Sequence, residues 1–362
     1  MQASAYAVID TLAIKHNLSL VRQYAAHSKI MAIIKANAYG HGLFTMADAL
    51  QEGVDAFGVA RVDEGIQLRQ AGFSKKITIL EGFVGQQELD TLIQHDLDAV
   101  VHSKNQIKLL QQQVGENKIS VWLKLDVGMN RLGFKSTEFK TVYQKLQQCR
   151  FVNKPLGLMT HLSNADDLDN QITTKQIAVF KEIVSQLDGE KSIANSAAII
   201  AWSDALSDWV RPGIMLYGVS PLSKEVKLKL KPVMSLYSRL IAIKNIQVGE
   251  AVGYSGTWVS KHNTLLGVVA IGYGDGYPRQ AKNGTPVLIN GERVPLVGRV
   301  SMDMITVDLG KQSNARVGDT VTLWGKGLAV EEIAYYADTI PYTLTCGITQ
   351  RVEIETLYEN YG

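Results

Sequence analysis

The sequence predicts an α/β barrel followed by a smaller, mostly β domain. Two observations lead to this prediction. Up to about residue 220, short runs rich in β-branched residues alternate with longer helical segments, the pattern of parallel strands joined by helices. Beyond that point, alternating strand-like stretches are separated by tight turns. The chain has 362 residues, 46% of them hydrophobic and 20% charged, which is enough for two domains with separate cores.

Eight strand-like runs support the barrel. The segments between them, such as residues 45–53, 87–96 and 173–187, have their apolar residues on one helical face. Eight such units over roughly 220 residues favour a (β/α)8 barrel, a TIM-like fold. A doubly wound open sheet is the alternative, but no glycine fingerprint follows the first strand. The expected strands are KIMAIIKA, DAFGVA, ITILEG, DAVVH, ISVWLKLD, LGLMTHL, KSIANS and GIMLYG.

The second domain is expected to be a β domain with one late helix. Residues 238–325 contain five strand-like stretches broken by Asn-Gly and Gly-Asp turns, and residues 330–338 have a helical pattern. We expect the domain boundary near residue 228. This gives a barrel over residues 1–228 and a C-terminal β domain over residues 229–362.

Composition argues against several classes of partner. The net charge is only +2, from 37 basic and 35 acidic residues, so we expect no binding to nucleic acid or to an anionic membrane. No run of about 18 apolar residues and no signal-peptide pattern occurs, so we expect a cytoplasmic chain. Two distant cysteines, Cys149 and Cys346, are too few for a disulfide framework or a metal site.

Polar residues follow several of the expected barrel strands. Lys35 ends the first run, Lys124 the fifth, His161 the sixth and Ser196 the seventh, while Arg211 is expected to open the eighth. Active sites of such barrels lie at the C-terminal ends of the strands. Each residue also has an ordinary explanation, such as a surface lysine or a hydrogen-bonded histidine. Their convergence on one rim favours a functional site.

Two short motifs indicate a place for a phosphate. In ANSAA, Ser196 either caps a helix or begins a helix terminus whose N–H groups bind phosphate. In RPGIMLYG, Gly213 and Ile214 form either a plain turn or a pair of N–H groups that an anion can approach closely. A phosphate cradle together with Lys35 suits an aldehyde cofactor that carries a phosphate and bonds to the lysine as a Schiff base.

Eight motifs spread over nearly the whole chain resemble one family, alanine racemase. The resemblance implies a barrel and a C-terminal β domain, pyridoxal 5'-phosphate as cofactor, and interconversion of L-alanine and D-alanine. Such a reaction either supplies D-alanine for peptidoglycan or breaks it down. The motifs are, in chain order, AIIKANAYGHG, LKLDVGMNRLGF, THLSNAD, ANSAA, RPGIMLYG, AVGYSGTW, IGYGDGYPR and VGRVSMDM.

The resemblance gives roles to the barrel residues. Lys35 matches the lysine that forms the Schiff base with the cofactor and then serves as one of two acid/base groups. An apolar strand before it fixes the amine and lowers its pKa. The residues that match phosphate ligands in the family are Tyr39, Ser196, Gly213 and Ile214.

Racemisation requires acid/base groups on both faces of the substrate, because the α-proton leaves one face and a proton arrives on the other. Tyr254 matches the second group in the family. A phenol is a poor base at neutral pH unless a cation stabilises its phenolate, and His161 and Arg211 match a hydrogen-bonded chain toward that tyrosine. The resemblance further implies that Arg211 faces the ring nitrogen of the cofactor. It also implies a head-to-tail homodimer, with Tyr254 reaching the partner's site.

The resemblance also suggests residues that contact the substrate. Arg131 matches a residue that holds the substrate carboxylate and the phenolic oxygen of the cofactor, and Met302 contributes a backbone N–H. Tyr273 and Asp303 match residues at the substrate entrance, although they could equally stabilise the contact between domains.

Lys124 matches a lysine that many family members carry as a carbamate. A carbamate would convert a like-charge contact with Arg131 into a charge-assisted pair. The alternative is an unmodified Lys124 paired with a nearby acid such as Asp126.

Three positions depart from the family pattern, and other functions remain open. Ser192 replaces a histidine found in some members, Gln350 replaces a phosphate-binding tyrosine, and Glu353 stands where proline is common. The main alternative is a broad-specificity amino-acid racemase. A barrel-type amino-acid decarboxylase is disfavoured for two reasons. Such an enzyme needs an acidic residue facing the ring nitrogen, where this chain has Arg211. It also needs a catalytic cysteine in the C-terminal domain, and Cys346 lies in no matching motif. A single-barrel cofactor carrier would need no second domain.

Overall fold

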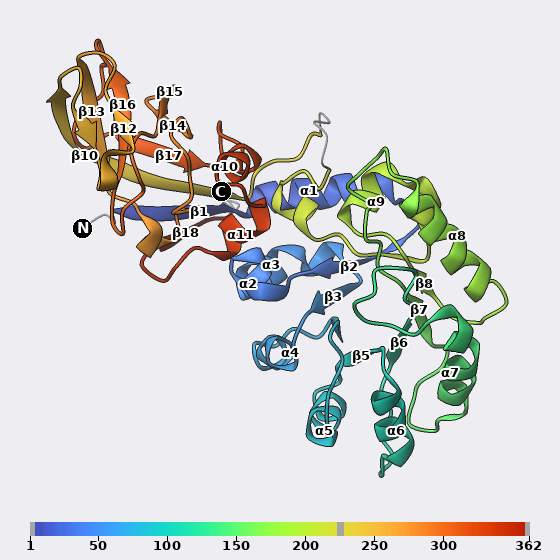
Figure 1. The fold of residues 1–362 in the computed structure, drawn as a ribbon. Helices are drawn as coiled ribbons and strands as arrows, with labels where there is room; N and C mark the ends of the chain where they lie inside the picture. Colours follow the sequence, from blue (N-terminus) through green and yellow to red (C-terminus); the bar gives the residue numbers. More distant parts are fainter. Residues whose placement is uncertain (1–3, 223–227, 359–362) are drawn as a thin grey trace.

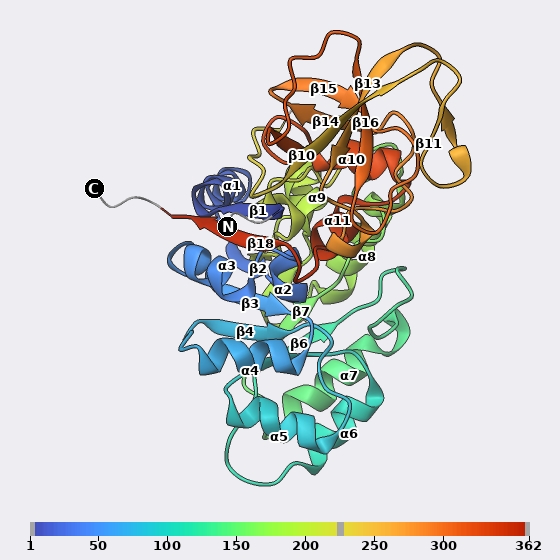
Figure 2. The same ribbon diagram turned by 90° about the vertical axis from the view of Figure 1, so that its left-hand side faces the viewer.

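The computed structural model describes residues 4–222 and 228–358. They form a barrel surrounded by helices and, beside it, a mostly β domain (Figure 1). After a 90° turn the two parts lie one above the other (Figure 2). Within these residues no helix is both long and apolar enough to cross a membrane.

The barrel is a closed ring of eight parallel strands, as the sequence predicts. Consecutive strands pair in parallel, and the last pairs with the first through Lys29 and Trp209. Most of the strand residues are buried, which explains their nearly continuous apolar character. The strands are β2 (Lys29–Ile33), β3 (Ala56–Val59), β4 (Lys76–Ile79), β5 (Asp98–Val101), β6 (Val121–Lys124), β7 (Gly157–Met159), β8 (Lys191–Ser192) and β9 (Trp209–Val210).

Helices surround the barrel and contact it through their apolar faces. The expected helices at residues 45–53, 87–96 and 173–187 correspond to α3, α5 and α8. The helices are α1 (Thr11–Tyr24), α3 (Leu43–Leu50), α4 (Val62–Gln70), α5 (Gln86–Gln94), α6 (Lys104–Gln112), α7 (Ser136–Gln148), α8 (Ile172–Val184) and α9 (Ser196–Ala201), with the short turns α2 (Lys35–Tyr39), η1 (Gln51–Gly53), η2 (Ser203–Ala205) and η3 (Ile214–Tyr217).

The prediction of the eighth strand was wrong. The run GIMLYG is not a strand but the 3-10 turn η3, and the strand β9 precedes it at Trp209–Val210. All four residues of η3 are buried, so the run is apolar because it is enclosed on every side. A short apolar run does not distinguish a strand from a buried turn. As a result, Arg211 follows the eighth strand and lies on the same rim as the other site residues.

In its described residues, the second domain contains a mixed sheet, a separate two-stranded sheet and two helices, in agreement with the predicted mostly β domain. Its long central strand β10 pairs with β1, β13 and β17. The elements are β10 (Met234–Ile246), β11 (Ala251–Val252), η4 (Tyr254–Gly256), β12 (Trp258–Val259), β13 (Thr264–Val269), η5 (Tyr273–Asp275), β14 (Pro286–Ile289), β15 (Glu292–Pro295), β16 (Ile305–Gly310), β17 (Thr320–Trp324), α10 (Val330–Tyr336), α11 (Pro341–Cys346) and β18 (Glu353–Leu357).

The first strand of the chain belongs to the mixed sheet of the second domain and not to the barrel. β1 (Ala5–Asp10) pairs antiparallel with β10 and parallel with β18, and Figure 1 shows this blue strand among the orange and red ones. Asp10 then caps α1 by accepting from two backbone N–H groups. Residues 5–10 therefore connect both parts. A boundary near residue 228 stays a prediction, and the adjacent residues 223–227 lie outside the described part of the chain.

Candidate active site

A cavity of about 1430 Å³ opens at the C-terminal ends of the barrel strands. The predicted site residues of the barrel come from different strand ends, and the closed ring brings them to one rim. Those that line the cavity are Lys35, Tyr39, Lys124, Arg131, His161, Ser196, Arg211, Gly213 and Ile214.

Lys35 begins a left-handed turn, α2. Left-handed backbone costs about 1–2 kcal/mol per non-glycine residue, so surrounding contacts must stabilise this turn. Glu64 Oε1 accepts from the N–H of Ala36 at 2.6 Å, and Asn37 Oδ1 accepts from the N–H of Leu43 at 2.8 Å. Four successive residues share a φ of 53°: Ala36, Asn37, Ala38 and Tyr39.

The environment of Lys35 favours its neutral amine. Burial lowers the pKa of Lys35, and the nearby cation Arg131 lowers it further, whereas Glu81 and Glu64 act in the opposite direction. A larger fraction of the amine is therefore neutral near pH 7 than in an exposed lysine. A neutral amine is the form that attacks an aldehyde or accepts a proton.

Ser196, Gly213 and Tyr39 come together beside Lys35 as a cradle. The Ser196 hydroxyl accepts from the N–H groups of Gly213 at 2.8 Å and Met215 at 3.4 Å. A Cβ on Gly213 would lie 2.6 Å from the Tyr39 hydroxyl, so only glycine fits there. Two hydroxyl groups and backbone N–H groups at this spacing match the donors that a phosphate needs.

Arg211 is buried and fixed by neutral partners. Its guanidinium donates to the Ser192 hydroxyl at 2.5 Å and to the carbonyl oxygens of Thr160 and Ile193. Burial lowers the pKa of Arg211 to about 10, so it remains a cation at neutral pH. Ser192, where some family members have histidine, thus binds the arginine.

His161 lies in the same cavity but forms no hydrogen bond with Arg211 in the part of the chain that the structure describes. Burial, and then the positive charges of Arg211 and Lys124, hold the pKa of His161 well below its ordinary value. The ring is therefore neutral at neutral pH. Within residues 4–222 and 228–358, Arg211 and His161 are not joined by a hydrogen bond, so the hydrogen-bonded chain that the resemblance implies stays a prediction.

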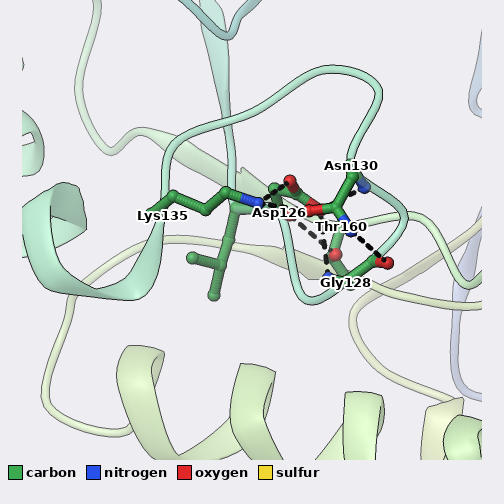
Figure 3. Close-up of polar contacts among 6 residues, drawn as sticks. Asp126, Gly128, Asn130, Lys135 and Thr160 are labelled. Carbon is green, nitrogen blue, oxygen red and sulfur yellow. Dashed lines mark hydrogen bonds and ion pairs between the residues drawn. The ribbon is translucent and has the colours of Figure 1, made fainter.

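Asp126 organises the loop that carries Arg131 (Figure 3). Its Oδ1 accepts from the N–H groups of Gly128 and Asn130, both at 3.0 Å, and its Oδ2 pairs with Lys135 Nζ at 2.6 Å. Burial raises the pKa of Asp126, but the bonds from Lys135 and the two N–H groups outweigh this effect and lower it. The carboxylate of Asp126 therefore holds the loop in its conformation through bonds to residues of the same loop.

Lys124 does not form an ion pair with Asp126, the pairing that the sequence suggested as the alternative to a carbamate. Asp126 is occupied by Lys135, and no ion pair of Lys124 occurs within residues 4–222 and 228–358. Burial and the cations Arg211 and Arg131 lower the pKa of Lys124 to about 8. The negative charge of Asp126 acts in the opposite direction but does not outweigh these effects. The amine of Lys124 is therefore partly neutral near pH 8, and the positive charges beside it would stabilise an anionic modification.

The remaining predicted residues lie in the second domain, away from this cavity. Tyr254 is 67% exposed on the turn between β11 and β12, a hairpin at the margin of the domain (Figure 2). Tyr273 and Met302 are also exposed, and Asp303 pairs with Arg351 at 2.8 Å. One copy of the chain therefore does not bring these residues to Lys35.

Several residues of the second domain that sequence reasoning missed also line the cavity, among them Glu331 and Tyr342. The Tyr342 ring lies 5.8 Å from the Tyr39 ring, because α11 lies against α2 (Figure 1). No motif signals this contact, since it depends on packing between distant segments. Gln350, which the resemblance matches to a phosphate-binding tyrosine of some members, does not line the cavity.

A buried lysine, a cradle of hydroxyl and N–H groups and a fixed arginine define a class of barrel enzyme that bonds a phosphorylated aldehyde through lysine. Among the described residues, no group of three or more His, Cys, Asp or Glu side chains could hold a metal ion. The family description "Alanine racemase, N-terminal domain" matches residues 9–221, and "Alanine racemase, C-terminal domain" matches residues 233–356. The chain belongs to the alanine racemase family, whose members are pyridoxal-phosphate-dependent isomerases.

Individual relatives match over the full length. The alanine racemase of Shewanella frigidimarina is 48% identical, and the match covers 97% of this chain and 98% of the relative. That of Vibrio cholerae is 49% identical over the same shares of both chains. The crystal structure of the biosynthetic alanine racemase from Pseudomonas aeruginosa superposes with a TM-score of 0.95 at 40% identity, covering 99% of this chain and 100% of that one.

Proposed function

We propose that the chain interconverts L-alanine and D-alanine by a two-base mechanism, with Lys35 and Tyr254 of a second copy on opposite faces of the substrate. The observation that carries the proposal is the cavity at the barrel rim, where a buried lysine lies beside a phosphate-type cradle. Pyridoxal 5'-phosphate, when bound, makes the α-proton of an amino acid acidic enough to be removed.

Residues of the barrel hold the cofactor in this proposal. Tyr39, Ser196, Gly213 and Ile214 bind the phosphate, supported by the close approach of the Tyr39 hydroxyl to Gly213. Arg211 would face the ring nitrogen, and because its guanidinium does not give up its proton, the ring would withdraw electrons less strongly and side reactions such as transamination would be disfavoured. His161 lies in the same cavity and, as a neutral ring, adds no charge.

The chain's own acid/base groups move the proton. Lys35 Nζ, with its lowered pKa, takes the α-proton from one face of the substrate or returns it there. The Tyr254 hydroxyl serves the other face. The substrate carboxylate is held by Arg131, whose loop is closed by Asp126, and by the N–H of Met302. Together, the two bases and the fixed carboxylate keep the α-carbon between both proton carriers.

A homodimer with shared sites belongs to this proposal. Tyr254 is 67% exposed and does not line the cavity that contains Lys35, so the two meet only if a second copy brings Tyr254 there. Tyr273 and Asp303 would then narrow the substrate entrance. Arg351 supports this surface by pairing with Asp303 at 2.8 Å and Asp275 at 3.2 Å.

A cytoplasmic location is also proposed, because both cysteines are free thiols, as a reducing compartment would keep them. There the enzyme would supply D-alanine for peptidoglycan or degrade it.

Incubating the purified protein with pyridoxal phosphate and L-alanine in heavy water tests the reaction type. We expect D-alanine that carries deuterium at the α-carbon, because the proton that arrives comes from solvent through the second base. Exchange with retained L configuration would mean that only one face is served, and release of carbon dioxide would mean a decarboxylase. Rates on serine, lysine and arginine, measured in parallel, separate an alanine-selective enzyme from a broad-specificity racemase.

Lys124 is expected to carry a carbamate. Its neutral amine adds to carbon dioxide and releases one proton, and the resulting anion lies near the cations Arg131 and Arg211. Because the pKa of Lys124 is about 8, the reactive amine becomes scarce as the pH falls below 8. Electron density in crystals grown above pH 8 with bicarbonate should show the added group, and crystals grown well below pH 8 should lose it. A bare amine under both conditions would contradict the modification.

A further inference from the structure

His41 is a buried side chain that the proposed chemistry does not use. Its Nδ1 is bonded to two carbonyl oxygens of the left-handed turn, that of Tyr39 at 2.9 Å and that of Ala38 at 3.1 Å. Both partners are acceptors, so the hydrogen lies on Nδ1. Burial lowers the pKa of His41 to about 4, which keeps the ring neutral at neutral pH. The histidine therefore holds the backbone of the residue that carries a cradle hydroxyl.

The ring of Tyr217 contacts the rings of both His41 and Tyr39 in a tilted arrangement. Its ring centroid is 4.6 Å from that of His41 and 4.8 Å from that of Tyr39. The Tyr217 hydroxyl donates to the carbonyl oxygen of Ile33, at the end of β2, at 3.0 Å. Tyr217 also ends the turn η3, which follows directly on Gly213. This single buried side chain thus links the strand end, the left-handed turn and the glycine turn.

We propose that His41 and Tyr217 are positioning residues for the phosphate of the cofactor. The inference rests on the proposed function, because it takes Tyr39 and Gly213 as phosphate ligands. Tyr39 has a backbone conformation that bulky residues rarely adopt, so its ring needs support from its neighbours. A Cβ built on Gly213 would lie only 2.6 Å from the Tyr39 hydroxyl, so the two residues are closely packed. A small shift of the Tyr39 ring would therefore change the distance between the groups that bind the phosphate.

Titration of the full-length chain with pyridoxal phosphate tests this role. His41→Phe keeps an aromatic ring but loses the donor, and we expect the dissociation constant to rise by about tenfold, as when a buried hydrogen bond is lost. His41→Asn keeps an N–H near the position of Nδ1, so most of the affinity should return. The phosphorus resonance of the bound cofactor should shift in His41→Phe and stay near the wild-type position in His41→Asn.

Tyr143→Phe is a matched control for general loss of stability. Its hydroxyl also donates to a backbone carbonyl at 3.0 Å, that of Asp188, but on α7, outside the barrel. This variant should melt at a lower temperature with unchanged cofactor affinity. The proposal is overturned if His41→Phe binds the cofactor like wild type, or if Tyr143→Phe weakens binding equally.

A further variant covers the case in which His41→Phe does not fold. Tyr217→Phe keeps the ring contacts with His41 and Tyr39 and removes only the bond to Ile33, so it should fold and bind the cofactor more weakly. Wild-type affinity in that variant would then overturn the proposal. A wild-type protein that does not bind pyridoxal phosphate would instead contradict the proposed function, so the two failures are distinguishable.

Discussion

Replacing Lys35 with alanine is expected to lower the rate of alanine racemisation by at least about 10³-fold. A positioned acid/base group alone contributes about 10²–10⁴-fold, and the variant also loses the amine that bonds to the cofactor aldehyde. The effect is large because no other lysine of the cavity can replace it. Lys124 extends from β6 beside Arg211 and Arg131, and not from the left-handed turn that carries Tyr39.

Lys29→Ala is the control for this prediction. Lys29 is the first residue of β2, the strand that leads to Lys35, so it lies at the opposite end of that strand, where it pairs with Glu190 at 2.5 Å on the surface. It should keep wild-type activity, measured as the rate of chirality change in L-alanine. Racemisation at a comparable rate in Lys35→Ala would contradict the role of Lys35.

The barrel was predictable because its pattern is local. Each strand has a short buried apolar run, and each longer helix has one apolar face, so run length and periodicity together distinguish most of them. The failure at residues 213–218 has the same origin, because a turn buried on all sides has the composition of a strand. The strand β1 was not predicted because its partners lie far along the chain, as in the pairing of Ala5 with Ser238.

The candidate site was predictable only in part. The residues that follow strands could be found from sequence, since the barrel brings strand ends to one rim. Supporting residues gave no such signal. The bonds of His41 depend on the left-handed turn, and the contact of Tyr342 with Tyr39 depends on the packing of α11 against α2. The carboxylate of Asp126 pairs with Lys135 and not with Lys124. These contacts follow from tertiary packing and not from any motif.

Mixing two inactive variants is expected to restore activity if the site is shared between subunits as proposed. Lys35→Ala and Tyr254→Phe each disable both sites of their own homodimer. After subunit exchange in an equal mixture, half of the dimers are hybrids, and each hybrid combines an intact Lys35 with an intact Tyr254 in one of its two sites. We therefore expect about one quarter of the wild-type activity, set by the two-fold symmetry of the dimer.

The recovered activity discriminates between a shared site and a site within one chain. If Lys35 and Tyr254 of the same chain formed the site, every site in the mixture would carry a defect and no activity would return. Mixing Lys35→Ala with Arg211→Ala is the matched control. Both residues line one cavity of one chain, so subunit exchange cannot bring an intact Lys35 and an intact Arg211 into the same cavity. Recovery in the control as well would mean that the assay detects something other than sharing. Recovery only with Tyr254→Phe would show that the exposed hairpin tip completes the site of its partner, because the barrel cavity and Tyr254 lie apart in a single chain.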